Sequence, residues 1–209
     1  MIKIIIVDDH AVVRKGLIQI LDEKPGIYSV DEANSGAELL SKVQHTDYDI
    51  IVLDISMQGK DGIDTLKTLK KIKPNATVLA FSMYPESQYA LRMLKSGAAG
   101  YLNKECAPDE FLKAIERVYK GGKYVSPELA ETLLENMNIN EAPLHENLSD
   151  REFQVMCMIA KGKSPTQIAA DLDLSINTIS TYRIRILEKL MIKNTAEITH
   201  YAIRNRLVE

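Results

Sequence analysis

The sequence has little of several features that mark specialised classes of protein. Its 209 residues contain no tryptophan, two cysteines and 6% aromatic residues. Cys106 and Cys157 lie far apart, and neither has a histidine at metal-ligand spacing, which excludes a disulfide framework and a zinc site. No apolar run approaches the roughly 20 residues that span a bilayer, and the first residues lack the layout of a secretory signal. We therefore expect a cytoplasmic protein with no membrane partner.

An excess of one charge sign is also lacking, because the formal net charge is only −3. A DNA-binding function therefore has to be argued from helix geometry, since no strongly basic domain stands out. Hydrophobic residues make up 45% and charged residues 26% of the chain, which is ordinary for a folded globular protein. The length predicts two domains of ordinary size, each with its own core.

Short β-branched runs alternate with longer amphipathic runs over the first hundred-odd residues. This alternation is typical of a parallel sheet wrapped by helices. A serine with a glutamate three residues on, at Ser35 and Glu38, predicts a capping box, and Pro108 predicts the first position of another helix. The first domain, 1–124, is therefore predicted to be α/β, a doubly wound five-stranded parallel sheet. The strands are expected at Ile2–Val7, Tyr28–Ala33, Ile50–Leu53, Thr77–Phe81 and Ala99–Leu102.

Strand signals disappear in the last third of the chain, and helix starts recur there at short intervals. The clearest start combines a cap at Ser164, a proline at Pro165 and a glutamine at Gln167. Residues 148–209 are therefore predicted to form a small all-α domain of four helices. The intervening segment, 125–147, is polar and contains proline, so we interpret it as a linker with a helix at about 127–137.

Polar residues follow four of the predicted strands: Asp8-Asp9, Asp54, Ser82 and Lys104. The carboxyl ends of parallel strands share one sheet edge, where functional groups gather. Three carboxylates there would repel one another, and a divalent ion such as Mg²⁺, which prefers oxygen ligands, would relieve that repulsion. A carboxylate can also attack a phosphoryl group to form an acyl phosphate. Each aspartate alone is more often a helix cap or a solvated charge, but their coincidence at one edge favours a site.

Residues 1–124 resemble the receiver domain of two-component response regulators. The motifs that carry the resemblance are "IVDDH" at 6–10, "VLDISMQGKDG" at 52–62, "LAFSM" at 79–83 and "GYLNK" at 100–104. The resemblance implies a flavodoxin-like fold and a sensor histidine kinase as partner. It also implies that Asp54 is the phosphoacceptor, and that Mg²⁺ is held by Asp8, Asp9, Asp54 and the backbone carbonyl of Ser56.

The same resemblance gives roles to three further residues. Ser82 and Lys104 would contact the phosphoryl group, and Tyr101 would be the switch aromatic that turns inward when Ser82 moves. The alternative for Tyr101 is half-buried packing at the end of an edge strand. Glu105 follows Lys104 where many receivers have a proline, and a cis bond before a residue other than proline costs roughly 3 kcal/mol. A trans Lys104–Glu105 peptide is therefore favoured.

The predicted helix at 176–191 has an apolar stripe centred on Ile179 that should face a core. Its opposite face carries small hydroxyl and amide side chains, which suit phosphate and base-edge contacts, and Ile184, which can pack on a thymine methyl. Arg183 lies nearer the stripe and has a structural ion pair as its alternative. The candidate DNA contacts are Asn177, Thr178, Ser180, Thr181, Arg183, Ile184 and Arg185.

Residues 148–208 resemble the LuxR/GerE-type helix-turn-helix domain of NarL/FixJ-type regulators. The matching stretches are "LSDREFQVM" at 148–156, "AKGKSPTQIAADLDLSINTISTYRIRILEKL" at 160–190 and "AEITHYAIRNRLV" at 196–208. The resemblance implies a double-stranded DNA operator as partner and a homodimer on activation. Met191 stands where glycine commonly ends the recognition helix, so we expect either a longer helix or a strained Met191.

Together these features predict a phosphorylation-dependent DNA-binding transcriptional regulator and not an enzyme. One alternative is a phosphatase that uses Asp54 as nucleophile. Such enzymes need a second acid two positions on, and that position holds Ser56. The other alternative is a phosphate-independent adaptor, which the intact acidic set disfavours.

Overall fold

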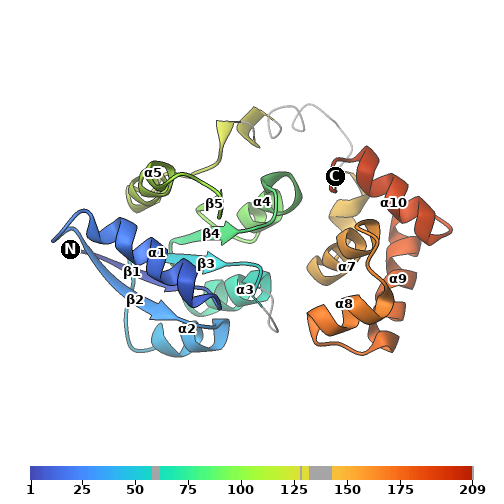
Figure 1. Ribbon diagram of the computed structural model, residues 1–209, viewed down its shortest axis with the longest axis horizontal. Coiled ribbons are helices and arrows are strands. Elements are labelled where there is room, and N and C mark those ends of the chain that lie inside the picture. The colour runs from blue at the N-terminus through green and yellow to red at the C-terminus, as the bar shows by residue number, and fades with distance from the viewer. Residues whose placement is uncertain (58–61, 128, 132–142, 209) are drawn as a thin grey trace. The chain divides into compact units, whose positions relative to one another are not determined.

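The computed structural model describes residues 1–57, 62–127, 129–131 and 143–208 (Figure 1). Contacts within the chain divide it into two compact units, Met1–Ala130 and Glu131–Glu209. Within the described residues, no helix is both long and apolar enough to cross a membrane.

The first unit is built on a parallel sheet with the strand order β2-β1-β3-β4-β5. This confirms the predicted α/β class, and the strands lie within one residue of their predicted bounds. The strands are β1 (Ile2–Val7), β2 (Tyr28–Ala33), β3 (Ile50–Asp54), β4 (Val78–Ser82) and β5 (Gly100–Asn103). The helices between and after them are α1 (Ala11–Asp22), α2 (Gly36–Lys42), α3 (Gly62–Ile72), α4 (Glu86–Lys95) and α5 (Pro108–Tyr119).

Both faces of the sheet are covered. Apolar residues of α1 and α5 share a core with alternate residues of four strands, for example Leu21 and Phe111 with Ile6 and Val52. Right-handed crossovers place α2, α3 and α4 on the opposite face. The strand order reverses at β1 and β3, so their carboxyl ends lie side by side and their loops diverge. That divergence leaves the crevice in which doubly wound sheets hold their functional groups.

The second unit is helical. It contains a 3-10 helix, η1 (Leu144–Asn147), followed by α7 (Asp150–Ala160), α8 (Pro165–Leu172), α9 (Ile176–Leu190) and α10 (Thr195–Arg204). The predicted caps form: the Ser164 hydroxyl accepts from the Gln167 amide, and the Gln167 side chain accepts from the Ser164 amide. Residues 173–175 join α8 to α9, and these two helices are in contact.

Part of the predicted linker 125–147 is helical. Residues 144–147 form η1, which contacts α9, and the Tyr201 hydroxyl of α10 accepts from the His145 amide at 3.1 Å. Of the predicted helix at 127–137, residues 127 and 129–131 are helical, and the remainder lies outside the described residues.

Met191 takes the second of its two expected states, because α9 stops at Leu190 and Met191 is left-handed with φ 55°. This conformation costs a residue with a Cβ about 1–2 kcal/mol, whereas glycine adopts it freely. We therefore expect Met191→Gly to raise the free energy of unfolding by about 1 kcal/mol, measured by urea denaturation. Asp173, also left-handed at φ 53°, is the matched control, and Asp173→Gly should gain less because aspartate tolerates this region. Equal gains would contradict the argument.

Candidate functional site

The acidic residues meet at the carboxyl edge of the sheet as predicted from the strand ends. Val7 pairs with Leu53, so the next residues, Asp8 just after β1 and Asp54 at the end of β3, lie side by side, and each is only 1% exposed. The Lys104 amide donates to the Ser82 carbonyl at 2.8 Å, which continues the pairing of β4 with β5 and turns Lys104 toward the same edge.

The side chain of Lys104 joins the two buried carboxylates. Its Nζ lies 2.6 Å from Asp8 Oδ2 and 2.8 Å from Asp54 Oδ2. Burial raises the pKa of the Asp54 carboxyl in spite of the lysine, whereas the two carboxylates outweigh the effect of burial on Lys104 and raise its pKa. Within the described residues no peptide bond is cis, so the Lys104–Glu105 peptide is trans and the lysine nevertheless reaches the acids.

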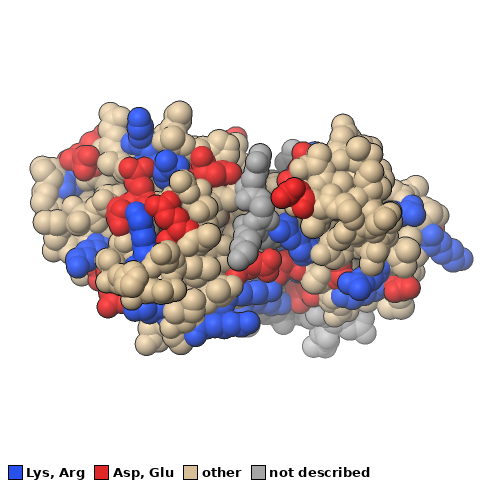
Figure 2. All heavy atoms as spheres, turned by 90° about the horizontal axis from the view of Figure 1, so that it is seen from below, with Lys and Arg blue, Asp and Glu red and all other residues tan. Residues whose placement is uncertain are grey.

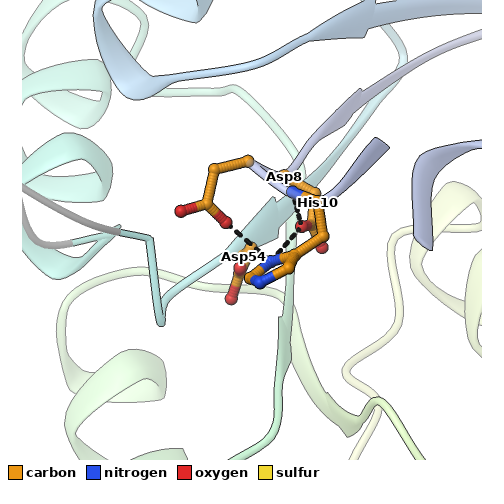
Figure 3. A group of neighbouring side chains, drawn as sticks. Asp8, His10 and Asp54 are labelled. Atoms are coloured by element: carbon orange, nitrogen blue, oxygen red, sulfur yellow. Dashed lines mark hydrogen bonds and ion pairs between the residues drawn. The ribbon is translucent and has the colours of Figure 1, made fainter. Parts of the chain in front are cut away.

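Asp8 and Asp54 also belong to a group of side chains that could hold a divalent cation. One ligand atom each from Asp8, Asp9, His10 and Asp54 lies within 4.8 Å of the others, and Figure 3 shows the labelled side chains converging. Asp8 Oδ2 is buried, and its partner among the described residues is the Lys104 ammonium at 2.6 Å. Carboxylate oxygens of this kind fit Mg²⁺. His10 was not among the predicted site residues, although it directly follows Asp8 and Asp9 in the sequence.

The neighbours of Asp54 hold its carboxylate in place. The Ser56 amide donates to Asp54 Oδ1 at 2.7 Å, and the Ser56 and Ser82 hydroxyls lie 3.1 Å apart. Ser82 Oγ also accepts from the Tyr84 amide at 3.0 Å. The buried Ser82 hydroxyl therefore lies next to the residue that binds Asp54, and it also contacts the loop that leads to α4.

Tyr101 is fully buried rather than half-buried as in the packing alternative. Its hydroxyl donates to the Tyr84 carbonyl at 2.8 Å, and burial raises the pKa of that hydroxyl. Ser82 and Tyr101 thus bind the amide and the carbonyl of the same residue, Tyr84. A shift of either side chain must therefore disturb this loop.

After α5, the chain contacts β5 and the first residue of α4. Tyr124 pairs with β5, its amide donating to the Ala99 carbonyl at 3.0 Å and its carbonyl accepting from the Tyr101 amide at 3.2 Å. Two residues later, the Ser126 hydroxyl donates to the carboxylate of Glu86, the first residue of α4. These contacts place the start of the segment that follows α5 against β5 and the first residue of α4.

Helix α9 turns an apolar stripe inward, as predicted, with Ile179, Ile186 and Leu190 buried. Ile184 is 52% exposed, and Thr181 is exposed with its hydroxyl donating to the Asn177 carbonyl at 3.0 Å. Thr178 and Ser180 are half-buried, and the exposed candidates also include Asn177, Arg183 and Arg185.

Two candidates have neighbours that the sequence did not indicate. The Thr178 hydroxyl lies 2.8 Å from the Ser175 hydroxyl of the helix cap. Arg183 and Ser180 line a pocket of about 570 Å³ with residues of α7, α8 and α10. Figure 2 shows basic and acidic side chains interspersed on one face of each unit, in keeping with the low net charge.

An acidic crevice joined to a lysine and a separate helix-turn-helix together define a response regulator with a DNA-binding output domain. The chain matches the family model of the response regulator receiver domain over residues 4–116 and that of bacterial regulatory proteins of the luxR family over residues 146–202. It therefore belongs to the LuxR-type response regulators of two-component systems.

Relatives match over essentially the whole length. The chain is 34% identical over 210 residues to response regulator UvrY of Escherichia coli K12, covering 99% of this chain and 96% of UvrY. It is 35% identical over 212 residues to response regulator GacA of Pseudomonas syringae pv. syringae, covering 100% and 99%. A solved structure of RcsB from Salmonella enterica serovar Typhimurium bound to the promoter rprA with the phosphomimetic BeF3⁻ matches with TM-score 0.67 and 26% identity, covering 96% of this chain and 98% of RcsB.

Proposed function

We propose that this response regulator accepts a phosphoryl group on Asp54 from a sensor histidine kinase, and that the modification controls its binding to operator DNA. The observation that carries the proposal is the buried Asp54 carboxylate, held between the Lys104 ammonium and the Ser56 amide beside further acids. In the transfer, an Asp54 oxygen forms a bond to phosphorus while the bond between phosphorus and the histidine nitrogen of the kinase breaks. Both kinase and DNA are met in the cytoplasm.

Mg²⁺ is the cofactor that fits this donor set, through Asp8, Asp9, Asp54 and the backbone carbonyl of Ser56. When bound, it neutralises charge on the phosphoryl oxygens. Lys104 remains within reach of the same oxygens and supplies a second positive charge. Ser82 offers a hydroxyl for a hydrogen bond to the phosphoryl group. Asp8 orients Lys104 through their ion pair.

Coupling to the output domain runs through Tyr84. A phosphoryl group that draws Ser82 toward Asp54 pulls on the Tyr84 amide, and Tyr101, bound to the Tyr84 carbonyl, follows. The contact of Glu86 with Ser126 then passes the change to the linker 125–147, which joins the receiver domain 1–124 to the DNA-binding domain 148–209. Shifting a two-state equilibrium from 1:99 to 99:1 takes about 5.5 kcal/mol. The favoured state is a homodimer whose two recognition helices meet the half-sites of an operator.

The phosphoacceptor is tested by incubating the full chain with acetyl phosphate and Mg²⁺ and measuring its mass. We expect a gain of one phosphoryl group in the wild type and none in Asp54→Asn, because the amide has no carboxylate oxygen to attack. Chelating Mg²⁺ should also prevent the gain. An unmodified wild type would favour a phosphate-independent adaptor instead.

We expect no sustained phosphatase turnover. A second acid two positions after the nucleophile is needed for that chemistry, and Ser56 stands there. The measurement is product release from a small phosphate ester at saturating Mg²⁺, and continuous release would overturn this part of the proposal.

The exposed face of α9 is expected to read bases. Thr181→Ala and Ile184→Ala should weaken binding to the operator by about 1–3 kcal/mol and affect random DNA much less, because base contacts carry the discrimination. The operator is first obtained by selection from random duplexes with and without BeF3⁻, and affinities are then compared at one salt concentration. Equal losses on operator and random DNA would show that these residues do not read sequence.

A further inference from the structure

A cavity of about 570 Å³ lies within the helix-turn-helix unit, between α9 and the ends of its neighbouring helices. Its walls are largely apolar, and they include Ile159 of α7, Pro165 of α8, and Ile176 and Ile179 of α9. The volume falls within the range of roughly 300–1,000 Å³ in which proteins commonly hold small molecules. We propose that the cavity binds a small carboxylate with an apolar body, and that the bound ligand competes with operator DNA for α9.

The charged side chains at this cavity are cations. Arg183 and Lys163 line it, and no aspartate or glutamate is among the described residues that do so. The charge of Lys163 is partly compensated, because its Nζ lies 2.6 Å from Asp171 Oδ2. Arg183 lacks the ion pair that was its structural alternative, since no described carboxylate contacts its guanidinium. An unpaired guanidinium beside apolar walls is the complement of a carboxylate, which it can bind through two parallel hydrogen bonds.

The backbone adds to the positive potential of Arg183. The first residues of three helices, α8, α9 and α10, line the cavity, and these are Pro165, Ile176 and Thr195. The amino end of a helix carries a partial positive charge. Neither α8 nor α9 has an acid in its first turn. The first-turn acid of α10, Glu197, accepts from the Lys193 amide and the Asn194 side chain. The cavity therefore favours an anion through its helix ends as well as its side chains.

A ligand in this cavity shares part of α9 with DNA. Ser180 and Arg183 line the cavity and are also candidate DNA contacts. A carboxylate bound to the Arg183 guanidinium withdraws that group from a phosphate or a base. By linkage, the ligand and the operator then weaken each other's binding by the same factor. This competition rests on the proposed DNA contacts of α9, whereas ligand binding rests on the cavity alone, and it gives the output domain an input that is separate from Asp54.

The class of ligand is tested by titrating octanoate, below its micelle concentration, into the full-length ¹⁵N-labelled protein and following the amide signals by NMR. We expect saturable binding of one octanoate per chain, with the largest shifts at Ala196 and Thr199 on the cavity wall. Acetate lacks the apolar body and octan-1-ol lacks the charge, so each should bind at least about tenfold more weakly. Acetate that binds as well as octanoate would indicate a plain anion site, such as one for a DNA phosphate, and would overturn the proposal. Octan-1-ol that binds as well would overturn it too.

Two pairs of variants locate the bound ligand. Arg183→Gln should bind octanoate about tenfold more weakly, because a charge-assisted hydrogen bond is lost. Arg185→Gln is its control, since Arg185 is exposed and does not line the cavity, and its affinity should stay within about twofold of the wild type. Ala196→Phe fills the cavity from the exposed first turn of α10 and should abolish binding, whereas His200→Phe, exposed on the same helix outside the cavity, should not. Equal affinities within either pair would overturn the site.

Competition is measured on the selected operator in the presence of octanoate. Saturating octanoate should weaken operator binding by the wild type at least about fivefold and leave Ala196→Phe unaffected. Octanoate that binds without changing operator affinity would overturn the competition with DNA. If octanoate does not bind while acetyl phosphate and Mg²⁺ still modify Asp54, this inference fails and the proposed function stands.

Discussion

Replacing Lys104 with methionine is expected to lower the free energy of unfolding by about 3–5 kcal/mol in the presence of EDTA. The lysine is the cation that contacts both buried carboxylates, and methionine fills similar space without the charge. Two acids that are each 1% exposed would then lie side by side with their compensation removed. Urea denaturation followed by circular dichroism gives the change in unfolding free energy.

The control is Lys113→Met on the exposed side of α5, which should change the unfolding free energy by less than about 0.5 kcal/mol. Adding Mg²⁺ should restore part of the stability of Lys104→Met, because an ion at 100 times its Kd stabilises the folded state by about 2.7 kcal/mol. A Lys104 variant as stable as the Lys113 variant would show that the buried acids do not depend on this ammonium.

Replacing Gly62 with alanine is expected to cost about 3 kcal/mol and to impair uptake of the phosphoryl group. A Cβ at this position would lie 2.4 Å from Ile55 Cα and 2.6 Å from the Asp54 carbonyl oxygen. Both atoms belong to the backbone, so no side chain can turn away and the end of β3 must shift. Unfolding in urea gives the stability, and the rate of mass gain with acetyl phosphate gives the effect on Asp54.

Gly16 provides the matched control for the Gly62 substitution. It lies inside α1, and a Cβ there would meet no atom within 4 Å. Gly16→Ala should therefore stabilise the protein by about 0.5–1 kcal/mol, because alanine favours the helix. The chemical change is the same in both variants. Opposite signs of the change in unfolding free energy would therefore assign the loss at Gly62 to the contact with the backbone of Asp54 and Ile55. A loss at Gly16 similar to that at Gly62 would contradict this explanation.

The strands and helix starts of this protein were predictable because their signals are local. β-branched runs located all five strands, and serine caps with a glutamine or glutamate at the third position located α7 and α8. The capping box predicted at Ser35 forms only in part. Ser35 accepts from the Glu38 amide, but the Glu38 carboxylate accepts from the Asn34 amide, one residue earlier than the pattern implies.

Features that depend on distant residues were not predictable. The 3-10 helix at 144–147 bonds to Tyr201, which lies 56 residues away from His145, and its own sequence resembles a polar linker. The approach of Lys104 to both acids depends on how three loops converge. The burial of Tyr101 depends on the position of the loop after β4, whose Tyr84 carbonyl binds the Tyr101 hydroxyl. Strand ends thus indicated which residues share an edge, whereas side-chain orientation required the tertiary structure.

The pairing of Tyr124 with β5 also bears on self-association. A β-strand at the margin of a sheet presents unused amides and carbonyls that invite addition of a strand from another molecule. In this protein Tyr124 occupies two of those groups, the Ala99 carbonyl and the Tyr101 amide. A Cβ at Gly100 would lie 2.6 Å from the Tyr124 carbonyl oxygen, so the fit allows only glycine. This stretch of the β5 edge is therefore closed to a strand from another molecule, because its hydrogen-bonding groups already have a partner within the chain.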